Sequence, residues 1–139
     1  MPPDEDQSWK RSRAEHSDRI RLEHMLIAAR QAAAFMASRT RADLDQDPML
    51  GRAVLHALQE IGEAASRVSD ATRARSPSLP WTQIVGMRHR LVHVYWSVNM
   101  DLVFEVIARD LTPLISAVES LTANWSLPPD EPIGETDSD

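Results

Sequence analysis

Apolar residues recur at intervals of three and four positions along most of this chain, which is the spacing of one buried face of an α-helix. The first such segment predicts a helix that begins after Ser17 or Asp18 as its N-cap and ends between Arg39 and Asp43. The residues predicted to form its buried face are Leu22, Met25, Leu26, Ala29, Ala33 and Met36.

A second helix is predicted to begin at Asp47 and Pro48, because Asp is a preferred N-cap and proline is tolerated at the first helical position. Gly62 lies on the apolar face of this helix. A glycine in mid-helix costs about 1 kcal/mol relative to alanine, so its presence predicts a close approach by another helix. The other residues of this face are Val54, Leu58, Ile61, Ala65 and Val68, and residues 75–80 are the predicted connection to the next helix.

Two further helices complete the pattern. The third is predicted to start at Pro80 or Trp81 and to bury Ile84, Met87 and Leu91. The fourth starts near Asn99, and Pro113 should kink or break it near residues 108–112, because proline lacks a backbone N–H and clashes with the preceding turn. Its apolar residues are Leu102, Val103, Val106, Ile107, Leu111, Leu114, Ile115, Val118 and Leu121. The sequence shows no strand pattern, internal repeat or glycine-rich phosphate loop, so we predict an all-α, antiparallel four-helix bundle with a kinked last helix.

The two ends of the chain lack the helical period and are predicted to be disordered. Residues 1–16 mix prolines with charges of both signs, and residues 126–139 carry acidic but no basic side chains. A single domain, residues 17–125, lies between them. The net charge of the whole chain is −6, and the acidic tail accounts for −5 of it, so the rest of the chain is nearly neutral.

The chain contains no cysteine, which excludes disulfides, zinc–thiolate sites and thiol catalysis. It shows neither a signal peptide nor the ~20 consecutive apolar residues of a membrane span. We therefore expect a cytoplasmic protein without membrane association.

The densest group of chemically capable side chains lies in residues 88–95, which read Arg-His-Arg-Leu-Val-His-Val-Tyr. An arginine, an imidazole and a phenol together could bind a phosphodiester and move its proton. RNA is a phosphodiester that carries its own nucleophile, the 2′-hydroxyl. Its cleavage therefore needs a proton acceptor, a group that stabilises the charged phosphorane, and an acid for the leaving oxygen. His93 suits the proton transfer and Arg88 suits the phosphorane, because a guanidinium fork matches two phosphate oxygens. Such cleavage needs no metal or other cofactor and leaves a 2′,3′-cyclic phosphate. The complementary acid stays open between His89 and the His93 of a second copy.

The surroundings of this motif favour a polyanionic ligand. Residues 71–100 contain no Asp or Glu, and they include Arg73, Arg75 and Arg90, which form either a solvated face or an RNA-facing one. Glu63 is either an ordinary helix carboxylate or a partner that orients Arg88. His89 and His93 are spaced for a shared metal ion, but no further ligand is evident, so no metal site is predicted. The remaining histidines are interpreted as structural or exposed: His16, His24 and His56.

Helix geometry constrains how the motif acts. Arg88 and His93 are five residues apart, which places them roughly 140° apart around an ideal helix, whereas Arg88 and Tyr95 nearly share a face. The helix is therefore expected to end or distort around residues 92–94, or a second copy of the chain supplies the missing half across a two-fold interface. We predict both, and hence a homodimer.

The motif resembles that of the HepT family of HEPN-domain ribonuclease toxins, and so do the helix start Pro80–Trp81, the run Ile-Gly-Glu-Ala at 61–64 and the run Arg-Leu-Glu-His-Met at 21–25. The resemblance covers residues 17–121 and implies a dimeric four-helix protein paired with an MntA-type nucleotidyltransferase antitoxin. It makes Arg88 and His93 the ribonuclease pair and Tyr95 the tyrosine to which the antitoxin adds AMP. His89 departs from the family, which most often has Asn there, so the supporting role of that amide is not carried over.

These observations predict the toxin component of a type VII-like toxin–antitoxin pair: a metal-independent endoribonuclease that is silenced by AMP on Tyr95. Two alternatives belong to other classes. The bundle could be a non-catalytic partner subunit of a nucleotidyltransferase, in which case His93 would be dispensable. It could also be an RNA-binding regulatory module, whose binding would fall with salt but leave no cyclic-phosphate ends.

Overall fold

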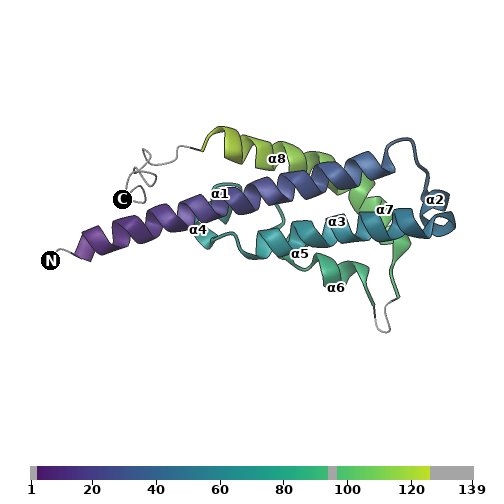
Figure 1. The fold of residues 1–139 in the computed structure, drawn as a ribbon, viewed down its shortest axis with the longest axis horizontal. Coiled ribbons are helices and arrows are strands. Elements are labelled where there is room, and N and C mark those ends of the chain that lie inside the picture. Colours follow the sequence, from purple (N-terminus) through teal and green to yellow (C-terminus); the bar gives the residue numbers. More distant parts are fainter. Residues whose placement is uncertain (1–2, 94–96, 126–139) are drawn as a thin grey trace, which may run out of the picture.

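The computed structural model describes residues 3–93 and 97–125, with side chains from Ser8 onward, and within that part of the chain every regular element is helical. The all-α bundle is therefore confirmed (Figure 1). The elements are α1 (Pro3–Met36), α2 (Arg41–Gln46), α3 (Pro48–Ser66), α4 (Asp70–Arg73), α5 (Trp81–Val85), α6 (Met87–Leu91), α7 (Met100–Glu105), the π-helix η2 (Val106–Asp110) and α8 (Leu111–Ala123).

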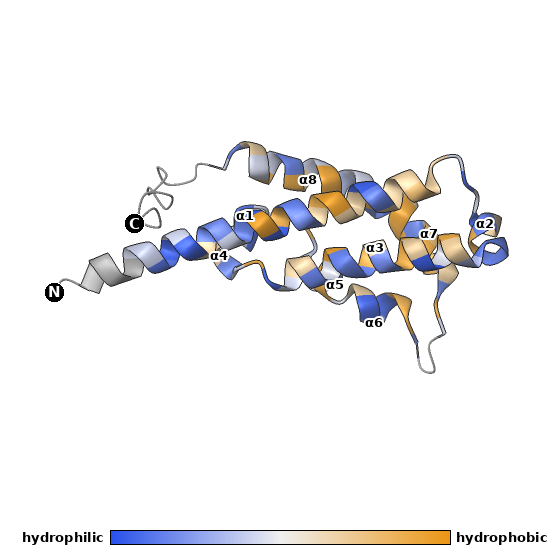
Figure 2. Ribbon diagram, viewed as in Figure 1, coloured by the Kyte–Doolittle hydropathy of each residue, from blue (hydrophilic) through white to orange (hydrophobic). Residues whose placement is uncertain are grey.

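The core lies where the long helix α1 packs between α3 and α8, while α5 and α6 cover the other side of α3 (Figure 1). Figure 2 shows hydrophobic segments, in orange, alternating with hydrophilic ones, in blue, along these helices. Ala33 was predicted to be buried but is exposed, because Ala32 rather than Ala33 lies on the buried side of the last turns of α1. The largest fully buried side chains are Leu22, Met25, Val54, Leu58, Ile61, Leu91, Val103, Val106 and Val118.

The start of α1 differs from the prediction. The helix begins at Pro3 and runs through Ser17 and Asp18 without interruption. Asp18 is buried and is not an N-cap of α1; its carboxylate accepts hydrogen bonds from the Thr72 hydroxyl at 2.6 Å and from the Ser69 backbone N–H at 3.0 Å. A side chain that favours helix caps thus fastens α1 to the start of α4, a tertiary contact that the local pattern does not encode.

The start of α3 and the role of its glycine are confirmed. Asp47 is the N-cap, and its carboxylate accepts a hydrogen bond from the Leu50 N–H at 3.2 Å. Gly62 lies against α5 and α6: a Cβ there would be 2.8 Å from the Ile84 carbonyl oxygen and 3.1 Å from the Met87 Cβ. This contact sets how closely α5 and α6 approach α3.

The third predicted helix is broken. α5 ends at Val85, Gly86 separates it from α6, and α6 ends at Leu91 because Val92 takes an extended conformation. Val92 pairs with Val98 in an antiparallel bridge, and the His93 N–H donates to the Ser97 carbonyl at 2.7 Å. The prediction that the helix ends before the motif is complete is therefore confirmed.

The last helix is distorted where Pro113 requires it. η2 separates α7 from α8, and the Leu111 N–H donates to the Val106 carbonyl, one residue further back than in an α-helix. This wide turn lies directly before Pro113, which has no N–H to donate. Asn99 caps α7, its side chain accepting from the Leu102 N–H at 3.0 Å. None of the helices in the described residues is both long and apolar enough to cross a membrane.

Candidate functional site

Arg88 projects from α6 into a pocket of about 290 Å³ on the polar face of α3. α6 can supply this guanidinium because Gly62 lets the α5–α6 segment lie directly on α3. Glu63 lines the same pocket, so the structure brings together Arg88 and the carboxylate that the sequence suggested as its partner. The remaining lining residues are His56, Gln59, Glu60, Gly62, Ser66 and Val85.

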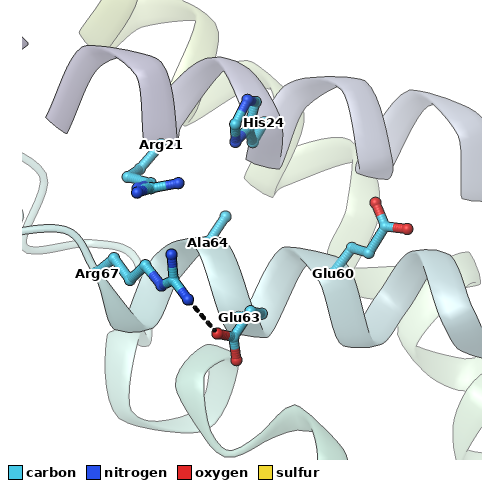
Figure 3. Close-up of a pocket in the computed structure, with 6 residues that line it drawn as sticks. All are labelled: Arg21, His24, Glu60, Glu63, Ala64 and Arg67. Atoms are coloured by element: carbon cyan, nitrogen blue, oxygen red, sulfur yellow. Dashed lines mark hydrogen bonds and ion pairs between the residues drawn. The ribbon is translucent and has the colours of Figure 1, made fainter. Parts of the chain in front are cut away.

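A second pocket, of about 310 Å³, adjoins the first and lies between α1 and α3 (Figure 3). Arg21 and His24 reach into it from α1, and Arg67 reaches from α3 and pairs with Glu63 at 3.2 Å. Glu60 and Glu63 line both pockets. The run 61–64 of α3 therefore lies between two pockets, one lined by residues of the run 21–25 and the other by Arg88 of the motif helix.

His56 and Glu60 lie one turn apart on α3, within the pocket that contains Arg88, and the His56 Nε2 contacts the Glu60 Oε1. His56 was predicted to be a structural or exposed residue. The signal was present in the i, i+4 spacing of the pair and in the position of Glu60 three residues before Glu63. It could not be recognised without knowing which side of α3 faces α6.

His93 follows α6 in the extended segment and is exposed. Among the described residues it does not line the pocket that contains Arg88. His89 is exposed on α6 and does not line it either. Tyr95 lies outside the described residues.

Arg73 and Arg75 are engaged by the fold. Arg73 donates to the Ala65 carbonyl at 2.9 Å, and its guanidinium lies 5.8 Å from the centre of the Trp81 ring. Arg75 lies 4.5 Å from the centre of the Trp125 ring at the end of α8. The guanidinium of each of these two arginines therefore contacts an aromatic ring.

Arg90 faces away from α3. It is half-buried and lines a pocket of about 230 Å³ between α5–α6 and the η2–α8 segment, together with Asp110 and Pro113. It therefore lies on a different side of α6 from Arg88. Among the described residues there is no group of three or more His, Asp or Glu side chains arranged to hold a metal ion.

Comparison with known proteins gives a consistent result. A model of the family described as "Ribonuclease HepT-like" matches residues 25–121. The chain is 33% identical to "Putative RNase TTE0752" of Caldanaerobacter subterraneus subsp. tengcongensis over 72% of this chain and 89% of that protein. It is 30% identical to "Probable ribonuclease HepT" of Thermococcus cleftensis over 50% of this chain and 63% of that protein. It is 32% identical to "Putative RNase MJ1380" of Methanocaldococcus jannaschii over 51% and 65%, respectively. No solved structure matches the chain.

Proposed function

Because this chain belongs to the HepT-like ribonuclease family, we propose that it is a metal-independent endoribonuclease that cleaves RNA through the 2′-hydroxyl of its substrate. The observation that carries the proposal is the pocket in which Arg88 faces the polar side of α3. Its relatives are named as RNases, which supports RNA as the substrate.

The chemistry follows from the two motif side chains. His93 takes the proton of the 2′-hydroxyl as the 2′-oxygen attacks phosphorus, and the guanidinium of Arg88 stabilises the charge on the non-bridging oxygens. The new P–O2′ bond forms as the P–O5′ bond breaks. The products are a 2′,3′-cyclic phosphate and a 5′-hydroxyl end, and the leaving oxygen takes up a proton.

The position of His93 supports a homodimer with a shared site. His93 does not line the Arg88 pocket of its own chain, and a two-fold axis close to α6 would bring the same residue from a second copy to it. Light scattering at micromolar concentration should report a dimer. Mixing inactive Arg88→Ala and His93→Ala chains should restore activity, because one site of the mixed dimer then has both residues. If the mixed protein stays inactive although it dimerises, the site is not shared.

We further propose that the protein is the toxin of a toxin–antitoxin pair whose MntA-type nucleotidyltransferase adds AMP to Tyr95. Tyr95 follows His93 by two residues, so a nucleotide there would put a bulky anion beside the cleavage site. Incubation with such an enzyme and ATP should add the mass of AMP to the peptide that contains Tyr95. If AMP were added at another residue, or if a Tyr95→Phe chain were silenced equally well, the proposal that Tyr95 is the switch would be wrong.

The experiment that tests the main proposal uses purified protein, RNA and EDTA. The parent should cleave the RNA, and His93→Ala should reduce the rate by roughly 10²–10⁴-fold, the usual contribution of a general acid or base. Cleavage that requires an added divalent cation would contradict the mechanism. Intact RNA together with stable binding of a nucleotidyltransferase would make the chain a non-catalytic partner subunit.

A further inference from the structure

The Arg88 pocket contains one of the imidazoles of the described residues, His56, and a carboxylate contacts this ring. The His56 Nε2 contacts Glu60 Oε1 along α3. A carboxylate partner of this kind fixes the tautomer, because the nitrogen that faces it carries the proton. The other ring nitrogen, Nδ1, is then free to exchange a proton with a ligand.

RNA cleavage needs such a group. The proposed mechanism has His93 as the proton acceptor, which leaves the 5′-oxygen without a donor when the P–O5′ bond breaks. His89 is exposed and does not line the pocket, and His24 lines the adjoining pocket instead. Among the described histidines, His56 is the one that lines the pocket with Arg88.

We infer that His56, oriented by Glu60, donates the proton to the leaving 5′-oxygen when RNA is bound against Arg88, an inference that rests on the proposed function. The step is balanced: the 2′-hydroxyl proton passes to His93, the Nδ1 proton of protonated His56 passes to the 5′-oxygen, and exchange with water restores both imidazoles. Gln59 and Ser66 line the same pocket and offer neutral hydrogen bonds to the substrate.

If His56 and Glu60 acted only on the fold, removing His56 would slow cleavage by destabilising the protein. His56 and Glu60 have 74% and 49% of their side chains exposed, and an exposed i, i+4 pair contributes little to the stability of a helix. Removing His56 should therefore leave the thermal midpoint close to that of the parent. Any large loss of cleavage would then come from the chemistry rather than from the fold.

The test compares two RNA substrates that differ in one atom. In the first the leaving group is the normal 5′-oxygen; in the second it is a 5′-bridging sulfur, which needs no acid because a thiol is far more acidic than an alcohol. On the first substrate His56→Ala should cleave roughly 10²-fold more slowly than the parent. On the second its rate should approach that of the parent, whereas His93→Ala should stay slow on both.

Two further variants control the result. Glu60→Gln should give a smaller loss than His56→Ala and the same recovery on the sulfur substrate, because it only releases the imidazole. His16→Ala removes an exposed histidine of α1 and should match the parent. If His56→Ala is as fast as the parent while His93→Ala is inactive, or if it is equally slow on both substrates, His56 is not the acid and the proposed function stands. If the parent does not cleave RNA, both the role of His56 and the proposed function are wrong.

Discussion

Residues 71–100 contain no Asp or Glu, and the arginines in the first part of this stretch, Arg73 and Arg75, are placed differently from Arg88 in its second part. In the first part Arg73 bonds to the Ala65 carbonyl and lies on Trp81, and Arg75 lies on Trp125. In the second part Arg88 stands in a pocket beside Glu63. The sequence shows the same surplus of positive charge in both parts. The difference teaches that local charge identifies where an anion is tolerated, while packing decides which arginine lies in a pocket and which lies on an aromatic ring.

The largest contrast is expected in cleavage. Arg88→Ala should lose roughly 10²–10³-fold in rate, as when a preorganised charge at the reacting group is removed, and Arg88→Lys should also be poor because an ammonium has no fork. Arg73→Ala should cleave near the parent rate. Initial rates at equal folded concentration measure this. Equal losses for the two alanine variants would erase the distinction between the two parts.

The next contrast concerns the contact that places Arg88. Gly62→Ala should destabilise the fold by about 1–3 kcal/mol, because its new Cβ meets the Ile84 carbonyl oxygen at 2.8 Å and the backbone cannot yield without moving α5 and α6. Cleavage should fall with it. Gly51→Ala is the matched control on α3: its Cβ would meet the flexible end of Met100, Cε, at 3.1 Å and the Leu44 carbonyl oxygen at 3.3 Å, both looser than the 2.8 Å contact at Gly62.

Chemical denaturation of the two glycine variants measures this difference. We expect Gly51→Ala to be clearly less harmful than Gly62→Ala and to keep its cleavage rate. A Gly62→Ala protein with parental stability and activity would show that the close approach of α6 to α3 is not required.

A smaller effect is expected at Arg73, and it should appear in stability. Arg73→Ala removes a charged hydrogen bond to the Ala65 carbonyl and the contact with Trp81, so the free energy of unfolding should fall by about 1–2 kcal/mol. Arg88 is exposed, and interactions of exposed charges contribute little, so Arg88→Ala should lower the free energy of unfolding by less than Arg73→Ala does. Denaturant midpoints measure this difference, provided that the free energy of unfolding depends equally on denaturant in both variants. If Arg88→Ala were the more destabilised variant, the structural role would belong to Arg88.

The smallest effect is expected at Arg75. Arg75 is exposed where it lies on the buried Trp125 ring, so Arg75→Ala should cost about 0.5–1 kcal/mol of stability. Measuring RNA affinity at several salt concentrations tests the alternative. If Arg75 contacts a phosphate, the slope of log K against log salt should decrease by about one in magnitude when it is removed. We expect the slope to stay unchanged, which would show that Arg75, like Arg73, contacts the fold and not an RNA phosphate.

The sequence predicted those parts of the fold that local chemistry determines. Asp47 and Asn99 cap helices as their side chains suggest, and Pro113 follows a distorted turn. The family indicated by the motif was also predicted and is confirmed. The start of α1 was wrong, because Asp18 has the chemistry of a cap but uses it on Ser69 and Thr72 in another element.

The candidate site was less accessible to sequence reasoning. Gly62 indicated a helix contact at that point, and Arg88 and Glu63 do line one pocket, but the carboxylate of Glu63 pairs with Arg67, so its role as a partner of Arg88 stays a prediction. The break at Gly86 was missed, although glycine is a weak helix former. His56 was missed because an i, i+4 His–Glu pair is usual on a solvated helix face. Only the packing of α6 on α3 turns that face into a pocket.

The central claim is that RNA is cut through its own 2′-hydroxyl at the Arg88 pocket, and one substrate tests it most directly. A short RNA with a single 2′-deoxy residue at the preferred cleavage position should resist the parent protein in EDTA at that linkage. The all-ribose RNA should be cut there and carry a 2′,3′-cyclic phosphate end. Cleavage of the deoxy linkage, or a product that ends in a free 3′-hydroxyl, would contradict the account.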